Sequence, residues 1–134
     1  MKRYFMDTNI LLDFLGNRQP FGSYALEILN KSRLKEWELW TSDNSILTSY
    51  YIISKEIGEI ESRTKISRLI NFLEIQPTQK THIQKALTSD FKDLEDGVQS
   101  FCASSIPKLK GIITRNKKDF QSSQIPIFEP WEVV

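Results

Sequence analysis

Cysteine and histidine are nearly absent from this sequence. Among its 134 residues there is one cysteine, Cys102, and one histidine, His82. A single thiol cannot form an internal disulfide, and the two residues do not make a zinc site of the usual Cys/His type. Cys102 follows Val98 at helical spacing, so we expect its thiol in the core rather than as a nucleophile. His82 opens a helical stretch without an evident partner, and we expect it at the surface, not as a general base.

Long apolar runs and a large net charge are also missing. No apolar segment approaches the roughly 20 residues of a membrane helix, and Met1–Asp7 reaches a carboxylate too early for a signal peptide. We therefore expect a cytoplasmic protein without membrane association. The formal net charge of +1 excludes a generally basic surface for nucleic acid but allows a local basic strip. Residues 1–134, with 40% hydrophobic and 26% charged side chains, fit a single globular domain.

Short apolar segments alternate with longer stretches of helical periodicity. The segments that favour strands are Tyr4–Met6, Glu38–Thr41, Lys110–Thr114 and Ile125–Phe128. Helical spacing of apolar residues runs through 10–15, about 23–34, 46–57, 66–73, 83–87 and 94–102. In the last helix the residues expected in the core are Leu94, Val98, Phe101 and Cys102. Strands separated by a dozen or more helical residues imply right-handed crossovers, so the pattern predicts an α/β fold with a parallel sheet. Pro126 favours an edge position for the last strand.

Oxygen-bearing side chains follow two of these strands and open one late helix. Asp7 comes directly after the first strand, Thr114–Asn116 after the third, and Asp93 and Asp96 begin the helix. Because the carboxyl ends of parallel strands share one edge of a sheet, we expect these groups to meet there. Crowded carboxylates repel one another, and a bound hard divalent cation usually compensates this repulsion. The sequence therefore suggests a metal-dependent hydrolase.

Each of these clusters also has a purely structural explanation. Asp7 suits a helix N-cap or an Asx turn, and Asp93 with Asp96 suits a capping box. Thr114–Asn116 fits a simple turn. The two aspartates of the late helix share one helical face with Ser100, however, away from the apolar stripe of that helix. The shared face favours a common site over three unrelated turns.

Three segments taken together resemble the PIN domain, a nuclease fold found in many bacterial VapC-type toxins. They are Met6–Asp13, Asp93–Asp96 and Ile113–Phe120, in this order, and they span nearly the whole chain. The resemblance implies a three-layer α/β fold, with a short central parallel sheet flanked by helices. It also implies an endoribonuclease that depends on Mg²⁺ or Mn²⁺, as the toxin of a toxin–antitoxin pair.

The resemblance assigns roles to residues at the expected sheet edge. The catalytic residues that it implies are Asp7, Asp93, Asp96 and Asn116. Asp7 and Asp96 take the place of the metal ligands. Three further residues at the same edge are predicted to contact the substrate: Asn9, Thr114 and Arg115. The partners implied are RNA, an antitoxin that masks the acidic groove, and a second copy of the chain in a homodimer.

One position departs from the family pattern. The family commonly has an acidic residue on the helix after the second strand, where this chain has Thr48 in the segment that starts at Ser42. The change removes one negative charge, which Asp93 or Glu95 would have to replace. Two hypotheses follow: an endoribonuclease in which two carboxylates and one ion suffice, or a catalytically degenerate PIN-like domain that acts as a binding or scaffolding module.

A third hypothesis is phosphoryl transfer to Asp7, as in haloacid dehalogenases or receiver domains. The dehalogenase pattern requires a second acid two residues later, where this chain has Asn9. Receiver domains require an acidic pair before the phosphoacceptor strand, and the sequence has none there. Both departures disfavour this hypothesis.

Overall fold

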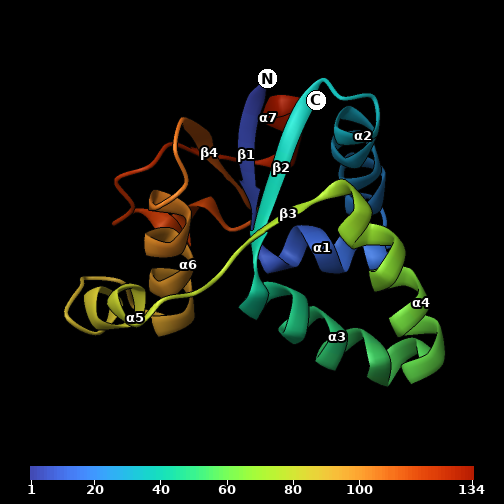
Figure 1. The fold of residues 1–134 in the computed structure, drawn as a ribbon, viewed down its shortest axis with the longest axis horizontal. Helices are drawn as coiled ribbons and strands as arrows, with labels where there is room; N and C mark the ends of the chain where they lie inside the picture. Colours follow the sequence, from blue (N-terminus) through green and yellow to red (C-terminus); the bar gives the residue numbers. More distant parts are fainter.

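Five parallel strands form the central sheet of the protein, in a computed structural model that describes residues 1–134 throughout. The strands are β1 (Lys2–Met6), β2 (Trp37–Ser42), β3 (Glu74–Gln76), β4 (Leu109–Ile113) and β5 (Ile127–Phe128). Their order is β3-β2-β1-β4-β5, and every neighbouring pair is parallel, which confirms the predicted α/β fold (Figure 1). β5 lies at an edge, as Pro126 indicates. β3 at the other edge is not predicted, because three residues are too few to show a period.

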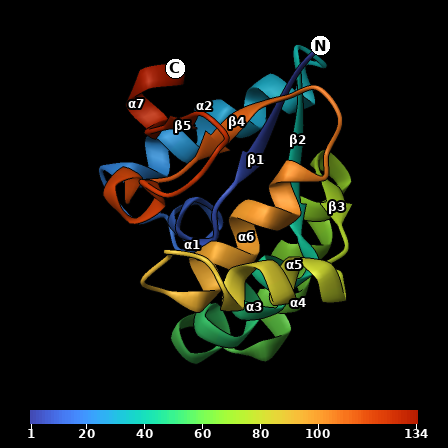
Figure 2. The same ribbon diagram turned by 90° about the vertical axis from the view of Figure 1, so that its left-hand side faces the viewer.

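Helices cover both faces of the sheet, so the fold has the three layers that were predicted. The helices are α1 (Thr8–Leu15), α2 (Phe21–Arg33), α3 (Asp43–Ile57), α4 (Glu59–Leu69), α5 (Lys80–Leu87), α6 (Leu94–Ser104) and α7 (Pro130–Val133), with short 3₁₀ turns η1 (Ile70–Phe72) and η2 (Lys117–Phe120). α1–α4 and α7 lie on one side of the sheet, and α5 and α6 lie on the other (Figures 1 and 2). None of these helices has the length and apolar character needed to span a bilayer.

The sheet divides the core in two, because successive side chains of a strand point to opposite faces. Tyr4 and Met6 of β1 belong to the larger part, which has 15 buried residues. Phe5 points the other way and packs with Ile112 and Phe120 in a smaller part of five buried residues. Burying an apolar side chain of this size stabilises the fold by about 1.5–3 kcal/mol. The two parts of the core therefore hold α1 and α6 against opposite faces of the same strands.

Two predictions about the helices on the second face are wrong. Leu94 is 47% exposed, because the buried face of α6 runs instead through Val98, Gln99 and Cys102. His82 is only 4% exposed, because its Nδ1 accepts a hydrogen bond from the backbone N–H of Gln79 and closes the first turn of α5. The prediction for Cys102 is confirmed. Its side chain is fully buried, and burial raises the pKa of the thiol to about 11.

The order of the strands creates a switch point beside β1. The chain passes from β1 to β2 on one side, whereas β4 pairs with β1 on the other side. Met6 at the end of β1 is in register with Ile113 at the end of β4, and the N–H of Asp7 donates to the carbonyl of Ile113 at 3.0 Å. In open α/β sheets, ligands bind at the carboxyl ends of the strands at such a point.

Candidate active site

Asp7 lies at the switch point and is 7% exposed. As the N-cap of α1, it accepts a hydrogen bond at Oδ1 from the backbone N–H of Thr8 at 2.8 Å. Its Oδ2 accepts from the hydroxyl of Thr114 at 2.8 Å and from the side-chain amide of Asn9 at 3.2 Å. Burial nevertheless raises the pKa of Asp7, because three neutral donors do not replace the lost hydration of a carboxylate. Asp7 is therefore the predicted N-cap and also a buried carboxylate whose charged form is disfavoured.

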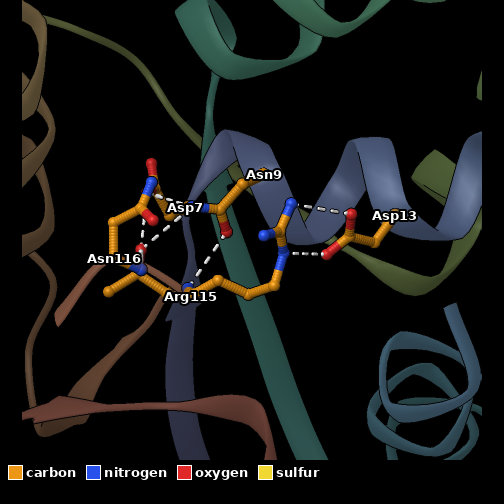
Figure 3. Close-up of polar contacts among 6 residues, drawn as sticks. Asp7, Asn9, Asp13, Arg115 and Asn116 are labelled. Carbon is orange, nitrogen blue, oxygen red and sulfur yellow. Dashed lines mark hydrogen bonds and ion pairs between the residues drawn. The ribbon is translucent and has the colours of Figure 1, made fainter. Parts of the chain in front are cut away.

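The segment after β4 surrounds Asp7 with further donors and acceptors (Figure 3). Asn9 also donates to the Thr114 hydroxyl at 3.1 Å, and its Oδ1 accepts from the backbone N–H of Arg115 at 3.3 Å. The backbone N–H of Asn116 donates to the Thr114 hydroxyl at 3.1 Å. The polar atoms of Asn9 and Thr114 are therefore engaged in holding Asp7. Substrate contact by these residues stays a prediction.

The guanidinium of Arg115 points along α1, away from Asp7, and meets Asp13 (Figure 3). Nε lies 2.5 Å from Oδ2 of Asp13, and one terminal nitrogen donates to Oδ1 at 3.1 Å. Asp13 is fully buried, and the guanidinium also lies over the ring of Phe21 at 4.2 Å from its centroid. This bidentate pair gives Arg115 a structural partner inside the protein, besides the predicted contact with substrate. Asp13 closes the first family segment, but nothing in its spacing marked it as the partner of Arg115.

The start of α6 brings the second pair of predicted carboxylates to the same place. Asp93 is the N-cap of α6 and accepts from the backbone N–H of Asp96 at 3.0 Å, as the capping pattern predicts. Asp96 is half-buried, and its pKa is raised to about 7. Burial is the largest cause, followed by repulsion from Asp7, Asp93, Asp119 and Glu95. The structure thus brings Asp7 and Asp96 together across 89 positions of sequence.

A cavity of about 580 Å³ opens beside Asp96 between the start of α6 and η2. Its charged lining residues are Asp90, Lys92, Asp93, Asp96, Lys118 and Asp119. Asp119, to which no role was assigned from the sequence, lines this cavity and contributes to the raised pKa of both Asp7 and Asp96. The signal was its place in the third family segment, one turn after Asn116.

The first turn of α3, the helix that carries Thr48, contacts neutral polar groups and the acid Glu95, to which the side-chain amide of Asn44 donates at 3.3 Å. Thr48 is half-buried and makes no side-chain hydrogen bond, while the first turn of α3 joins a buried network around Gln99. Oε1 of Gln99 accepts from the hydroxyl of Ser42 at 2.7 Å, and its Nε2 donates to the hydroxyls of Ser45 and Thr8. Gln99 lies one turn after Asp96, so this network ties α6 to α1 and α3 beside the acidic cavity.

The donor set fits an open magnesium or manganese site rather than a closed cage. No three acidic, histidine or cysteine side chains converge on one point. Mg²⁺ usually keeps several waters and needs only one or two carboxylates, with substrate phosphates completing its shell. Burial is the largest cause of the raised pKa values of Asp7 and Asp96, and neighbouring acids raise them further; a hard cation would offset both effects. Glu95 also raises both pKa values, so it is near enough to replace part of the charge that Thr48 lacks.

Comparisons with known proteins agree with this architecture. A family model described as PIN domain matches residues 3–118. The chain is 31% identical over 133 residues to Ribonuclease VapC1 of Aquifex aeolicus, which covers 94% of this chain and 89% of the relative.

Solved structures share the fold. A chain of the VapBC2 complex of Rickettsia felis, bound to a DNA fragment from its promoter, superposes with a TM-score of 0.69 at 15% identity and covers 95% of this chain and 99% of that one. A chain of a toxin–antitoxin complex from Klebsiella pneumoniae gives a TM-score of 0.65 at 25% identity, with coverage of 95% and 97%. The fold and the carboxylates at its switch point define a PIN-like protein. The chain belongs to the PIN domain family, and within that family it is of the VapC type.

Proposed function

We propose that the protein is a metal-dependent endoribonuclease and the toxin of a toxin–antitoxin pair. The observation that supports the proposal is the burial of Asp7 at the switch point, near enough to Asp96 that its charge, after burial itself, helps to raise the pKa of Asp96 to about 7. The similarity to a protein named as a ribonuclease supports RNA as the substrate, and the similarity to toxin–antitoxin complexes supports an antitoxin as the partner. By the same reasoning, the activity belongs in the cytoplasm.

Asp7 and Asp96 would hold Mg²⁺ or Mn²⁺, with Asp119 and Glu95 adding negative charge. When bound, the ion supplies a Lewis acid for the scissile phosphate and lowers the pKa of a coordinated water. Thr114 and Asn9 fix the orientation of the Asp7 carboxylate through their hydrogen bonds to it.

The other predicted residues have complementary tasks. Asp93 holds the first turn of α6, and therefore Asp96, through its bond to the backbone N–H of Asp96. Asn116 is exposed and its side-chain amide has no partner, so we assign it the orientation of the attacking water. Of the two lysines that follow, Lys117 pairs with Glu132 at 3.2 Å, whereas Lys118 lines the cavity and suits a phosphate beside the scissile bond.

Two protein partners follow from the surfaces around the site. The acidic lining of the cavity at Asp96 suits a basic segment of an antitoxin, which would compete with the metal and the RNA. A second hollow, between α3, α5 and α6, has Leu47, Ile83 and Leu94 exposed around it. We propose that a second copy of the chain covers these apolar side chains in a homodimer; light scattering that shows a monomer at micromolar concentration would oppose it.

The test is calorimetric titration of the metal-free protein with Mn²⁺, followed by cleavage of single-stranded RNA. Asp7→Asn and Asp96→Asn are expected to abolish binding and cleavage together. Glu27→Gln makes the same change of charge on the exposed side of α2 and serves as the control. Metal binding without cleavage of any RNA by the wild type would favour the degenerate binding module instead. Absence of both would favour it further, and Thr48→Glu would then be expected to restore metal binding.

A further inference from the structure

We propose that the amino edge of the sheet is a second binding surface for single-stranded RNA, at the opposite end of the strands from the candidate active site. Lys2 opens β1, Lys108 directly precedes β4, and Lys35 lies two residues before β2. The three strands β2, β1 and β4 are adjacent in the sheet (Figure 2). Lys2 is in register with Trp37, two residues after Lys35, and Arg3 is in register with Leu109, which follows Lys108, so the three lysines, here called the basic edge, lie at the same end of the sheet. Neighbouring strands are about 4.8 Å apart, so the flexible ammonium groups can follow the phosphates of one nucleic-acid strand.

No lysine of the basic edge has an acidic partner, and all three are exposed. Two of the acids nearby are engaged elsewhere: Glu38 pairs with Arg3 at 3.1 Å and Glu36 pairs with Lys31 at 3.2 Å. Glu74 in the adjoining groove is exposed, so the edge presents three lysines against one free acid, although the whole chain has a net charge of only +1. A local field of this kind attracts a polyanion irrespective of the total charge.

Two lysines of the basic edge have a backbone conformation that is unfavourable for any residue with a side chain. Lys35 has φ 60° and Lys108 has φ 58°, both in the left-handed region. A side chain there costs about 1 kcal/mol relative to glycine. The C-terminal dipole of α2 accounts for Lys35, which directly follows the C-cap Leu34, but Lys108 precedes a strand and belongs to no helix end. The side chain of Lys108 is thus the feature that needs an explanation.

A groove beside the basic edge provides room for a base. Its volume is about 370 Å³, and its lining includes Arg33, Lys35, Trp37 and Phe72, with Glu74 as an exposed acid. Phe72 is 38% exposed, and an exposed ring next to cations is the combination by which proteins bind single strands without reading sequence. The groove and the three lysines together match an RNA strand better than they match an acidic peptide, which has no flat base to stack.

The position of the surface predicts a dependence on RNA length. Five residues of β1 at about 3.3 Å each separate Lys2 of the basic edge from Asp7 at the candidate active site by about 17 Å. A short RNA would occupy the cavity alone, whereas a longer one would reach both ends of the strands. The inference rests on the proposed RNA substrate, because it assigns the second surface to the same molecule.

The experiment measures fluorescence anisotropy of a labelled single-stranded RNA of about 16 nucleotides, a length within the range of known single-strand sites. Chelator prevents cleavage during the titration. The variant Lys2→Glu/Lys35→Glu/Lys108→Glu is compared with a control that changes three exposed, unpaired cations elsewhere: Arg68→Glu/Lys80→Glu/Lys85→Glu. We expect at least tenfold weaker binding by the first variant only, with a salt slope flatter by about 2.

A second variant separates binding from folding. Lys35→Gly/Lys108→Gly removes two cations while relieving two left-handed backbone positions, so it should melt no lower than the wild type and still bind RNA more weakly. Equal losses of RNA affinity in both triple variants would mean that only net charge matters, and would overturn the proposal. It would also be overturned if polyglutamate displaced the labelled RNA as well as unlabelled RNA does.

The proposed ribonuclease is tested separately with an RNA of about four nucleotides and Mn²⁺. If both triple variants cleave it like the wild type and bind the long RNA equally, the basic edge is wrong and the ribonuclease stands. If the wild type cleaves no RNA but loses binding when the basic edge is reversed, the surface stands and the ribonuclease is wrong.

Discussion

The charged carboxylate of Asp96 lowers the stability of the folded state. Its pKa rises from 3.8 to about 7 in the folded chain, chiefly through burial. Between these two values the folded state keeps a proton that the unfolded state has lost, so stability falls as pH rises from about 4 to 7. The carboxylate therefore destabilises the metal-free protein at neutral pH and serves the site instead.

Asp96→Asn is accordingly expected to stabilise the metal-free protein at pH 8, where the native carboxylate is charged. We expect a gain of about 1–2 kcal/mol, because solvent screens a half-buried group and reduces the effect of a shift of this size. At pH 3, which lies below both pKa values, the folded and the unfolded chain both keep the proton, so the gain should nearly vanish. Urea unfolding at the two pH values in chelator measures this, and a loss of stability at pH 8 would contradict the assigned shift.

Arg115 has opposite consequences, because its partner is fully buried. Arg115→Ala leaves the carboxylate of Asp13 without a counter-charge, and we expect a loss of about 3–5 kcal/mol in unfolding free energy. The double variant Asp13→Leu/Arg115→Met, which removes both charges, should recover most of it. If Arg115→Ala lowers RNA affinity but leaves the unfolding free energy unchanged, the predicted contact with substrate is the main role of this arginine.

At the scale of elements, the β4–β5 pair depends on the absence of one side chain. A Cβ at Gly111 would lie 2.5 Å from the carbonyl oxygen of Pro126 and 2.6 Å from the ring of Phe128. Gly111→Ala must therefore push the edge strand away, and we expect a loss of about 2–3 kcal/mol by chemical denaturation. Gly58→Ala is the comparison: its φ of 88° is strained but nothing lies near its Cβ, so about 1 kcal/mol is expected.

The position of α6 depends on Gln99, which binds the first turns of α1 and α3. Gln99→Leu keeps the volume but leaves the buried hydroxyl of Ser42 with only its longer bond to Ser45 at 3.2 Å and removes the amide donor to Ser45 and Thr8, so we expect a loss of about 2 kcal/mol. Because α6 carries Asp96, weaker Mn²⁺ binding should accompany it in calorimetry. The control is Ser100→Ala, on the same helix as Gln99, which removes one hydrogen bond to Ser123. Unchanged metal affinity in Gln99→Leu would show that the network supports the fold without positioning the carboxylate.

For the whole molecule, metal and fold should be linked through the switch point. A cation that binds only the folded chain stabilises it by about 2.7 kcal/mol at a hundredfold excess over its dissociation constant. Mn²⁺ should therefore raise the melting temperature of the wild type at pH 8 and leave Asp7→Asn unchanged. An equal rise in both proteins would mean that the ion binds elsewhere.

The spacing of the sequence alone determined the parallel α/β fold, and the resemblance to the PIN domain added its three layers. Apolar periods mark four of the five strands and the main helices, and the crossover rule then orients the strands. It also predicted that Asp7 and Thr114 lie at one sheet edge, because they follow strands that prove to be neighbours. These features depend on local spacing, which a single chain displays in full. β3 was missed because three residues have no spacing to read.

Only the tertiary structure decided what each polar group faces. The pairing of Arg115 with Asp13, the burial of His82, the exposure of Leu94 and the place of Asp119 beside Asp96 all depend on which elements pack together. Burial and charge act through space, so residues 100 positions apart change one another's pKa and partners while leaving no trace in the spacing of either segment. The basic edge is of the same kind, since its three lysines come from the ends of three strands that meet only in the folded sheet.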